Sequence, residues 1–155
     1  MVINNSEMLV KSLGACRLDS PLSPLLENRK RSIHNVDEHD RVLFDDTVHM
    51  AVERGSSVDA LPGFEPAGPR KKIFFDPSKT RVGVVTCGGL CPGLNDVIRG
   101  LVMELTFHYG VKRIYGFKNG YQGFIARYGR SVLDLTPESV SGVNEEGGTI
   151  LGTSR

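Results

Sequence analysis

The sequence predicts an α/β fold in which a short parallel sheet is covered by helices. Three observations lead to this prediction. Residues 82–85 (Val-Gly-Val-Val) form a short apolar run with β-branched residues, typical of a buried strand. Arg113-Ile-Tyr-Gly-Phe117 predicts a second strand, and between the two strands apolar residues recur at helical spacing, at 94, 97, 98, 101, 102 and 105. Strand, helix and strand within about 36 residues make a βαβ unit, which favours a parallel sheet covered on both faces.

Local residue types set the ends of these elements. A glycine and proline turn, Gly88–Asn95, separates the first strand from the helix, and Pro92 suits the start of a helix because its missing N–H costs least there. Gly110 is a good helix stop. Thr136-Pro-Glu138 combines an N-cap residue, a first-turn proline and a first-turn acid, which predicts a further short helix.

Composition excludes several classes of protein. The chain has 155 residues, of which 39% are hydrophobic and 24% charged, and no run approaches the about 18–20 apolar residues that a membrane span requires. The formal net charge of +1 gives no overall field for nucleic acid or an anionic membrane, so any anionic ligand requires a local site. Three cysteines are too few for a disulfide scaffold and fit a reducing compartment, so we expect a cytoplasmic protein.

The distribution of glycine divides the chain. Of 18 glycines, four precede residue 81 and 14 follow it. We therefore expect a flexible N-terminal extension over 1–40, an arm or linker over 41–80 and an α/β domain over 81–155. Within the arm, 41–44 and 71–75 are strand candidates, 48–54 is a possible short helix, and 62–69 is rich in Pro and Gly. A plastid-targeting peptide is the alternative interpretation of the N-terminus, although its basic, acid-poor pattern is weak.

The strongest local signal for chemistry is the turn Thr86-Cys-Gly-Gly-Leu-Cys-Pro-Gly-Leu-Asn95. Gly88 and Gly89 lack a Cβ, so a ligand can approach the backbone closely. The free N–H groups at the start of the helix, with its dipole, would suit a phosphate. The pattern is neither the dinucleotide fingerprint nor the P-loop. A tight strand-to-helix turn without a ligand is an equally good interpretation of the spacing.

Other candidates are weaker on spacing alone. Arg155 closes a second glycine loop and could bridge phosphate oxygens, but a solvated arginine explains it as well. Tyr121 lies between glycines and could stack on a base or simply pack. Cys87 and Cys91 lack two further zinc ligands at suitable spacing, so buried or half-buried free thiols are favoured and no metal ligand is assigned.

Three segments in this order and spacing resemble the 6-phosphofructokinases: Gly88-Gly-Leu-Cys-Pro-Gly-Leu-Asn-Asp-Val-Ile-Arg99, Gly120-Tyr-Gln-Gly123 and Gly147-Gly-Thr-Ile-Leu-Gly-Thr-Ser-Arg155. The particular residues in these motifs, including Cys87 and Cys91, resemble the plant ATP-dependent form. The segment over 68–80, which precedes the first motif, does so too. The resemblance covers roughly residues 40–155 of the chain. It implies a three-layer α/β fold of the phosphofructokinase type.

The resemblance also implies an activity and roles. The family transfers the γ-phosphoryl group of ATP to fructose 6-phosphate in glycolysis, with Mg²⁺, and its members are commonly homo-oligomers. By position, Gly88 and Gly89 resemble the contacts to the ATP phosphates, and Tyr121 the aromatic residue on the nucleotide side. Arg155 resembles the arginine that steadies the transferring group.

The sequence also departs from the family's pattern. The Gly-Gly-Asp-Gly loop that serves magnesium and the Thr-Ile-Asp segment that supplies the base are both absent. Phosphoryl transfer requires positioning, metal and base together, so we expect the leading fragment of a kinase, inactive alone. The metal ligand is expected beyond the end of this chain. A non-catalytic nucleotide-binding or subunit-interaction module, and a pyrophosphate-dependent phosphofructokinase, are the alternatives.

Overall fold

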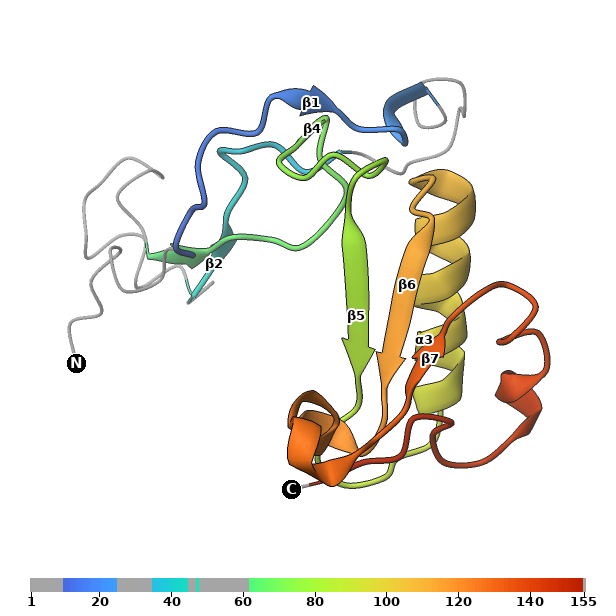
Figure 1. Cartoon of the computed structure of the whole chain (residues 1–155). Helices are drawn as coiled ribbons and strands as arrows, with labels where there is room; N and C mark the ends of the chain where they lie inside the picture. Colours follow the sequence, from blue (N-terminus) through green and yellow to red (C-terminus); the bar gives the residue numbers. More distant parts are fainter. Residues whose placement is uncertain (1–9, 25–34, 45–46, 48–61, 155) are drawn as a thin grey trace. The chain divides into compact units, whose positions relative to one another are not determined.

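The computed structural model describes residues 10–24, 35–44, 47 and 62–154. The chain divides into two compact units, Met1–Phe74 and Phe75–Arg155, and each is described here by itself (Figure 1).

The first unit contains two short antiparallel strand pairs. β1 (Leu18–Asp19) pairs with β4 (Lys72–Ile73), and an ion pair between Asp19 and Lys72 supports this register. β2 (Val42–Leu43) pairs with β3 (Gly63–Phe64). The strands expected within 41–44 and 71–75 are therefore present, and β3 lies in the Pro/Gly-rich stretch of the expected arm or linker. The helix expected over 48–54 lies outside the described residues.

The second unit is built on a mixed three-stranded sheet in the order β5-β6-β7. β5 (Arg81–Val85) and β6 (Arg113–Phe117) are parallel, as the βαβ pattern predicts. β7 (Val132–Asp134) is antiparallel to β6, so the expectation of a wholly parallel sheet is wrong for this strand. The segment between β6 and β7 forms two short 3₁₀ turns, Gly120–Phe124 and Ala126–Tyr128, and no helix that could carry the chain back for a parallel return.

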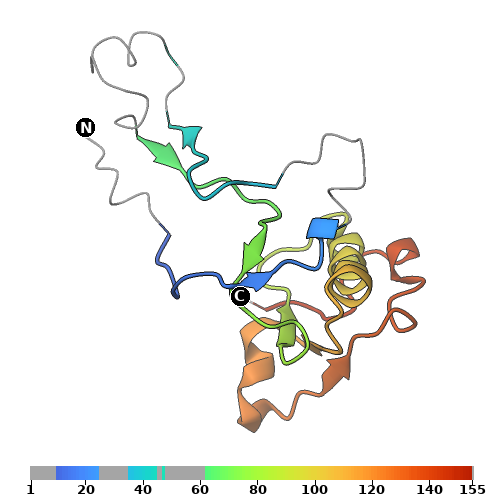
Figure 2. The ribbon, with the colours of Figure 1, turned by 90° about the horizontal axis from the view of Figure 1, so that it is seen from above.

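One α-helix covers one face of this sheet, and Figure 2 shows it end-on beside the strands. α3 (Leu94–Met103) continues into a π-helical turn (Glu104–His108) and ends at Gly110, whose φ of +71° suits a glycine (Figure 1). The start and stop expected from the sequence are thus confirmed. Within residues 75–154, α3 is the only α-helix, so the α/β class holds while a second helical layer is not part of the described structure.

The face that α3 buries is narrower than the periodicity predicts. Ile98 and Val102 are fully buried, whereas Val97 and Leu101 are 59% and 44% exposed. The third buried position on this helix is polar, because Asn95 is only 3% exposed. A buried amide must be hydrogen-bonded, so Asn95 marks a structural connection rather than ordinary core packing.

The core lies between α3, the sheet and the C-terminal loop. Leu151 enters it from that loop and lies over β6 at Gly116, where a Cβ would come within 2.5 Å of a Leu151 methyl carbon. Gly116 therefore allows the C-terminal loop to approach the sheet closely. The buried hydrophobic residues are Val84, Ile98, Val102, Val111, Ile114, Leu135, Val140, Val143 and Leu151.

The short helix expected at Thr136 is instead a hydrogen-bonded turn. Thr136 and Ser139 cap each other through their side-chain oxygens and backbone N–H groups, at 2.8 and 3.2 Å. The backbone N–H of Glu138 and the Thr136 hydroxyl lower the pKa of the Glu138 carboxyl. The capping residues are present as predicted, but Gly142 follows within two turns and a helix this short gains little cooperativity.

Candidate functional site

Three loops meet at the carboxyl ends of β5 and β6, near the lower ends of these strands in Figure 1. The loop after β5 is tied to the C-terminal loop by four hydrogen bonds, one of which joins the Thr86 and Thr149 hydroxyls at 3.2 Å. The Gly88 N–H donates to the Ser154 carbonyl at 3.2 Å, and the Thr153 hydroxyl donates to the Gly88 carbonyl at 2.7 Å. The Thr86 hydroxyl donates to the Gly152 carbonyl at 2.6 Å. The two glycine loops, far apart in the sequence, therefore form one structure.

The loop after β6 joins the same cluster. The Asn119 N–H donates to the Leu151 carbonyl at 2.7 Å, and the Ser154 hydroxyl donates to the Asn119 carbonyl at 2.7 Å. Gly120 is buried here with a φ of +60°, and a Cβ at this position would lie 2.6 Å from the Ser154 hydroxyl oxygen. Only glycine fits at this contact.

Asn95 connects the start of α3 to the C-terminal loop. Its amide nitrogen donates to the Glu146 carbonyl at 2.9 Å, and its amide oxygen accepts from the Ile150 N–H at 2.8 Å. Both the nitrogen and the oxygen of this buried amide therefore have a hydrogen-bond partner. The connection fixes the C-terminal glycine loop beside the N-terminal end of the helix.

The N-terminal end of α3 is open. Gly93, the N-cap residue, has a φ of +87°, and no side chain caps the helix. Gly88 is half-buried with a φ of +93°, and its missing Cβ would meet no atom within 4 Å. Gly89 is exposed. At Gly88 the turn therefore presents backbone that no side chain covers, beside the positive end of the helix dipole, which is a suitable place for a phosphate. The Asp96 carboxylate lies at the Gly93 end of the turn, 3.8 Å from the position of a Cβ on Gly93.

Cys87 and Cys91 are exposed free thiols, and the expectation of buried or half-buried thiols is wrong. Cys87 nevertheless lies beside the loop after β6, because a Cβ at Gly120 would come within 3.2 Å of its Sγ.

The structure places two of the four predicted site residues, Gly88 and Gly89, in the turn itself. Tyr121 follows Gly120 and is 70% exposed; its ring centroid lies 6.1 Å from that of Phe124, which stacks on Phe117 at 4.2 Å. Arg155 lies outside the described residues. Its neighbour in the chain, Ser154, contacts both other loops through its backbone and hydroxyl.

Sequence reasoning missed the polar residues that hold the loops together. Asn95 carried a detectable signal, because 95, 98 and 102 share one helix face and a polar residue there implies a buried hydrogen bond. The residues Thr86, Asn119, Thr153 and Ser154 carried none, because their partners lie more than 30 residues away in the chain.

The described residues do not form a magnesium site. Among the described residues, no three His, Cys, Asp or Glu side chains gather where a metal ion could be held. Asp96, in the first turn of α3, is exposed and is the carboxylate nearest in sequence to the turn. We therefore derive no step through a metal from these residues.

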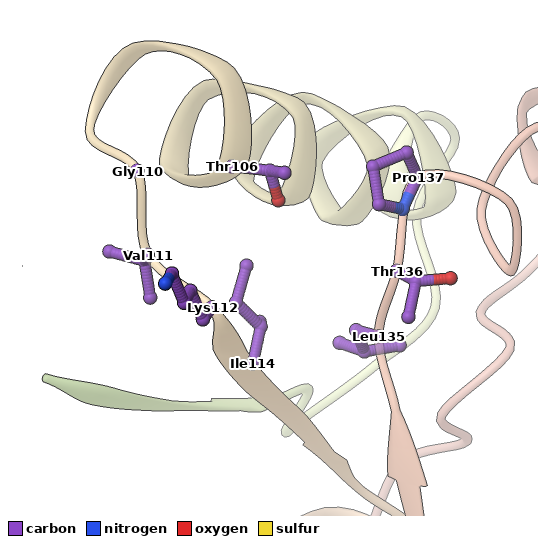
Figure 3. Close-up of a pocket in the computed structure, with 8 residues that line it drawn as sticks. All are labelled: Thr106, Gly110, Val111, Lys112, Ile114, Leu135, Thr136 and Pro137. Carbon is purple, nitrogen blue, oxygen red and sulfur yellow. The ribbon is translucent and has the colours of Figure 1, made fainter. Parts of the chain in front are cut away.

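Three hollows lined by described residues lie at the opposite end of the sheet. One, of about 370 Å³, lies between the C-terminal end of the helical segment, the start of β6 and the segment after β7 (Figure 3). Its walls include Val111, Ile114, Leu135 and Pro137, and Lys112 stands at its edge. This hollow is separate from the glycine loops. No helix of the described residues is long and apolar enough to cross a membrane.

A glycine-rich turn from a parallel strand into an uncapped helix, closed by a second glycine loop, defines an α/β protein with a candidate phosphate site. Residues 81–155, which contain all of these features, match the family model described as phosphofructokinase. The similarity to the phosphofructokinase family thus covers the part of the chain that contains the glycine loops and α3.

Curated relatives extend the match over the rest of the chain. The ATP-dependent 6-phosphofructokinase of Amycolatopsis methanolica is 52% identical over 155 residues, which is all of this chain and 34% of that protein. The ATP-dependent 6-phosphofructokinase 1 of Arabidopsis thaliana is 43% identical over 136 residues, 86% of this chain and 27% of that protein. This chain therefore spans about a third or less of the length of these relatives. Identity is higher to the bacterial protein than to the plant one, so these matches do not single out the plant form.

Among solved structures, Pichia pastoris phosphofructokinase in the T-state is 25% identical and matches with a TM-score of 0.43 over 54% of this chain and 8% of that chain.

Proposed function

We propose that this chain supplies the ATP-phosphate-binding part of an ATP-dependent 6-phosphofructokinase, an enzyme of glycolysis. The observation that carries the proposal is the convergence of the three glycine-containing loops beside the open N-terminal end of α3. The homology of the chain to enzymes named ATP-dependent supports ATP rather than pyrophosphate as the donor. The assignment to the plant-type form is a more specific proposal, which rests on the particular residues in the motifs.

The proposed phosphate contacts are made mainly by the backbone. A phosphate beside Gly88 and Gly89 would accept hydrogen bonds from the N–H groups at the start of α3 that the helix cannot use, in the field of the helix dipole. The Gly88 N–H itself already donates to the Ser154 carbonyl. The hydrogen bond that Gly88 accepts from the Thr153 hydroxyl and the one that it donates to the Ser154 carbonyl hold this turn before any ligand arrives, so little ordering is required on binding.

Two side chains complete the proposed nucleotide site. Tyr121, exposed at the rim of the loop after β6, would lie against the nucleoside part of ATP. Arg155, directly after Ser154, would bridge phosphate oxygens and stabilise the charge on the transferring phosphoryl group. Fructose 6-phosphate, the base that deprotonates its hydroxyl and the magnesium ligand would be held by residues that these loops do not contain.

Gly89→Val tests the proposed approach of phosphate to the backbone. Gly89 is exposed and is not among the glycines with positive φ, so a valine at this position does not require a left-handed backbone. We expect the Kd for ATP, measured by isothermal titration calorimetry, to rise by about tenfold or more, the equivalent of one charge-assisted hydrogen bond.

Gly142→Val is the matched control, because Gly142 has a φ of −109° and its missing Cβ faces open space. This variant should bind ATP as the unchanged chain does. Equal ATP affinity in Gly89→Val and Gly142→Val, with both folded by circular dichroism, would contradict the proposed site.

A further inference from the structure

Four basic residues surround a hollow at the end of the sheet opposite the glycine loops. The hollow, of about 470 Å³, is lined by Ser78, Lys79, Thr80, Arg81, Lys112 and Arg113. These residues come from the segment that leads into β5 and from the start of β6. In Figure 1 this is the upper end of both strands. The two ends of a five-residue strand are roughly 13 Å apart, so this hollow is separate from the candidate ATP site.

The sheet places two of these cations directly opposite each other. Arg81 and Arg113 are register partners at the first position of the parallel β5–β6 pair. Like charges in this arrangement destabilise a sheet unless an anion lies between them. Both residues are exposed, and the pairing of the following four positions in each strand fixes their backbones.

No carboxylate of the described residues compensates this charge. Asp76 pairs with Lys79 at 3.3 Å, and its other oxygen accepts from the Ser78 hydroxyl at 2.6 Å. Within residues 62–154, Arg81, Lys112 and Arg113 form no ion pair with any acid. Three positive charges therefore remain around the hollow, in a chain whose formal net charge is only +1.

The chemistry of these groups limits the ligand. Two guanidinium forks and an ammonium group match the oxygens of phosphate groups, and three charges require more than a monoanion. The hydroxyls of Ser78 and Thr80 already donate to Asp76, so the cationic groups are left to make the contacts. A nucleic acid would require an extended basic surface, which the balanced charge of the chain does not provide.

We propose that this basic hollow, defined by Lys79, Arg81, Lys112 and Arg113, binds a small anion that carries two or more phosphate groups. It is a second anion site, distinct from the ATP site proposed above and independent of it. Bound there, the anion bridges the starts of β5 and β6 and removes the repulsion between Arg81 and Arg113.

The test uses inorganic pyrophosphate as the probe, titrated into the full chain at constant ionic strength. Arg81→Gln/Arg113→Gln should weaken pyrophosphate binding at this site by about tenfold or more. Arg127→Gln/Arg130→Gln is the matched control, because it removes the same charge from two exposed arginines outside the hollow. Gly89→Val, which obstructs the proposed ATP site, should leave this binding unchanged.

Thermal melting gives a second readout, because the substitutions that weaken pyrophosphate binding should not lower the Tm of the chain without anion. Without anion, Arg81→Gln/Arg113→Gln should melt at the same temperature as the unchanged chain or higher, since a repulsion has been removed. Pyrophosphate should raise the Tm of the unchanged chain and of the control, but not that of this variant.

Lys79→Gln/Lys112→Gln, which leaves both strand-pairing arginines in place, repeats the binding test if the arginine variant does not fold. Equal pyrophosphate affinity in the hollow variants and the Arg127/Arg130 control would overturn the proposal. Loss of binding in Gly89→Val alone would also overturn it, because that result would assign the anion to the glycine loops.

Discussion

Asn95 is the side chain that joins the helix to the C-terminal glycine loop. It is 3% exposed and makes two hydrogen bonds to backbone groups 51 and 55 residues further along the chain. A leucine would fit the apolar face of α3 better, yet the amide is required because the Ile150 N–H and Glu146 carbonyl need a partner. At this position the helix therefore carries a polar residue that holds the C-terminal loop in place of an apolar residue that would pack better.

Asn95→Leu should therefore destabilise the chain even though it adds apolar volume to a core position. The Ile150 N–H loses its acceptor and the Glu146 carbonyl its donor, and one unsatisfied buried group costs about 1–3 kcal/mol. Urea unfolding should show this loss. Val97→Leu, at an exposed site on the same helix, is the control and should change stability little. Equal stability of the two variants would show that these hydrogen bonds are replaced by water.

The turn that leads into β5 is the element on which pH should act. The Ser78 hydroxyl and backbone N–H, with Lys79, lower the pKa of the exposed Asp76 carboxyl below its ordinary 3.8. A group whose pKa is lower in the folded chain stabilises the fold when it is ionised. This contribution is therefore fully present above pH 3.8 and is lost as the pH falls through the lower folded pKa.

Asp76→Asn should lower the Tm slightly at neutral pH, and its difference from the unchanged chain should shrink below about pH 4. Thermal melts between pH 2 and 7 measure this difference. Ser78→Ala removes the first cause of the shift, so in that variant the acid-sensitive step should move to higher pH. A difference between Asp76→Asn and the unchanged chain that stays constant over the whole range would contradict this role for the turn.

At the scale of the whole molecule, the loops proposed to bind the ATP phosphates are present, while the family's segments for the metal and the base are not. The sequence contains no Gly-Gly-Asp-Gly or Thr-Ile-Asp segment, and the described residues form no metal cluster. The chain also spans 34% of the Amycolatopsis relative. Phosphoryl transfer requires metal, base and positioned substrates together. We therefore expect these residues to bind phosphate without catalysing its transfer.

We expect the 155-residue chain by itself to give only background in a coupled assay with ATP, magnesium and fructose 6-phosphate. Joined to the remaining two thirds of the Amycolatopsis relative, it should support turnover. In that chimera Arg155→Ala should lower kcat by about 10- to 1,000-fold, the effect of one lost electrostatic donor. Arg155→Lys should restore little, because an ammonium group cannot reproduce the planar fork.

Turnover by the 155-residue chain that disappears in Gly89→Val would contradict this separation, since it would require a base and a metal ligand among these residues. An unchanged kcat in the Arg155→Ala chimera would show that Arg155 is a solvated side chain.

Local patterns in the sequence determined β5, α3 and β6, because each depends on the apolar run, helical spacing or glycine stop of its own residues. The glycine turn at Gly88 was predictable for the same reason. The direction of β7 was not, because antiparallel pairing depends on how residues 118–131 fold rather than on the three residues of the strand.

Only the tertiary structure decided how the candidate site is assembled. The contacts of Asn95 with Glu146 and Ile150, and of Gly88 with Thr153 and Ser154, join segments more than 50 residues apart. The opposition of Arg81 and Arg113 likewise follows from strand register. The sequence by itself determined which residues can turn, cap or pack. Which of them meet was decided by folding, because contacts between distant segments depend on the packing of the whole unit.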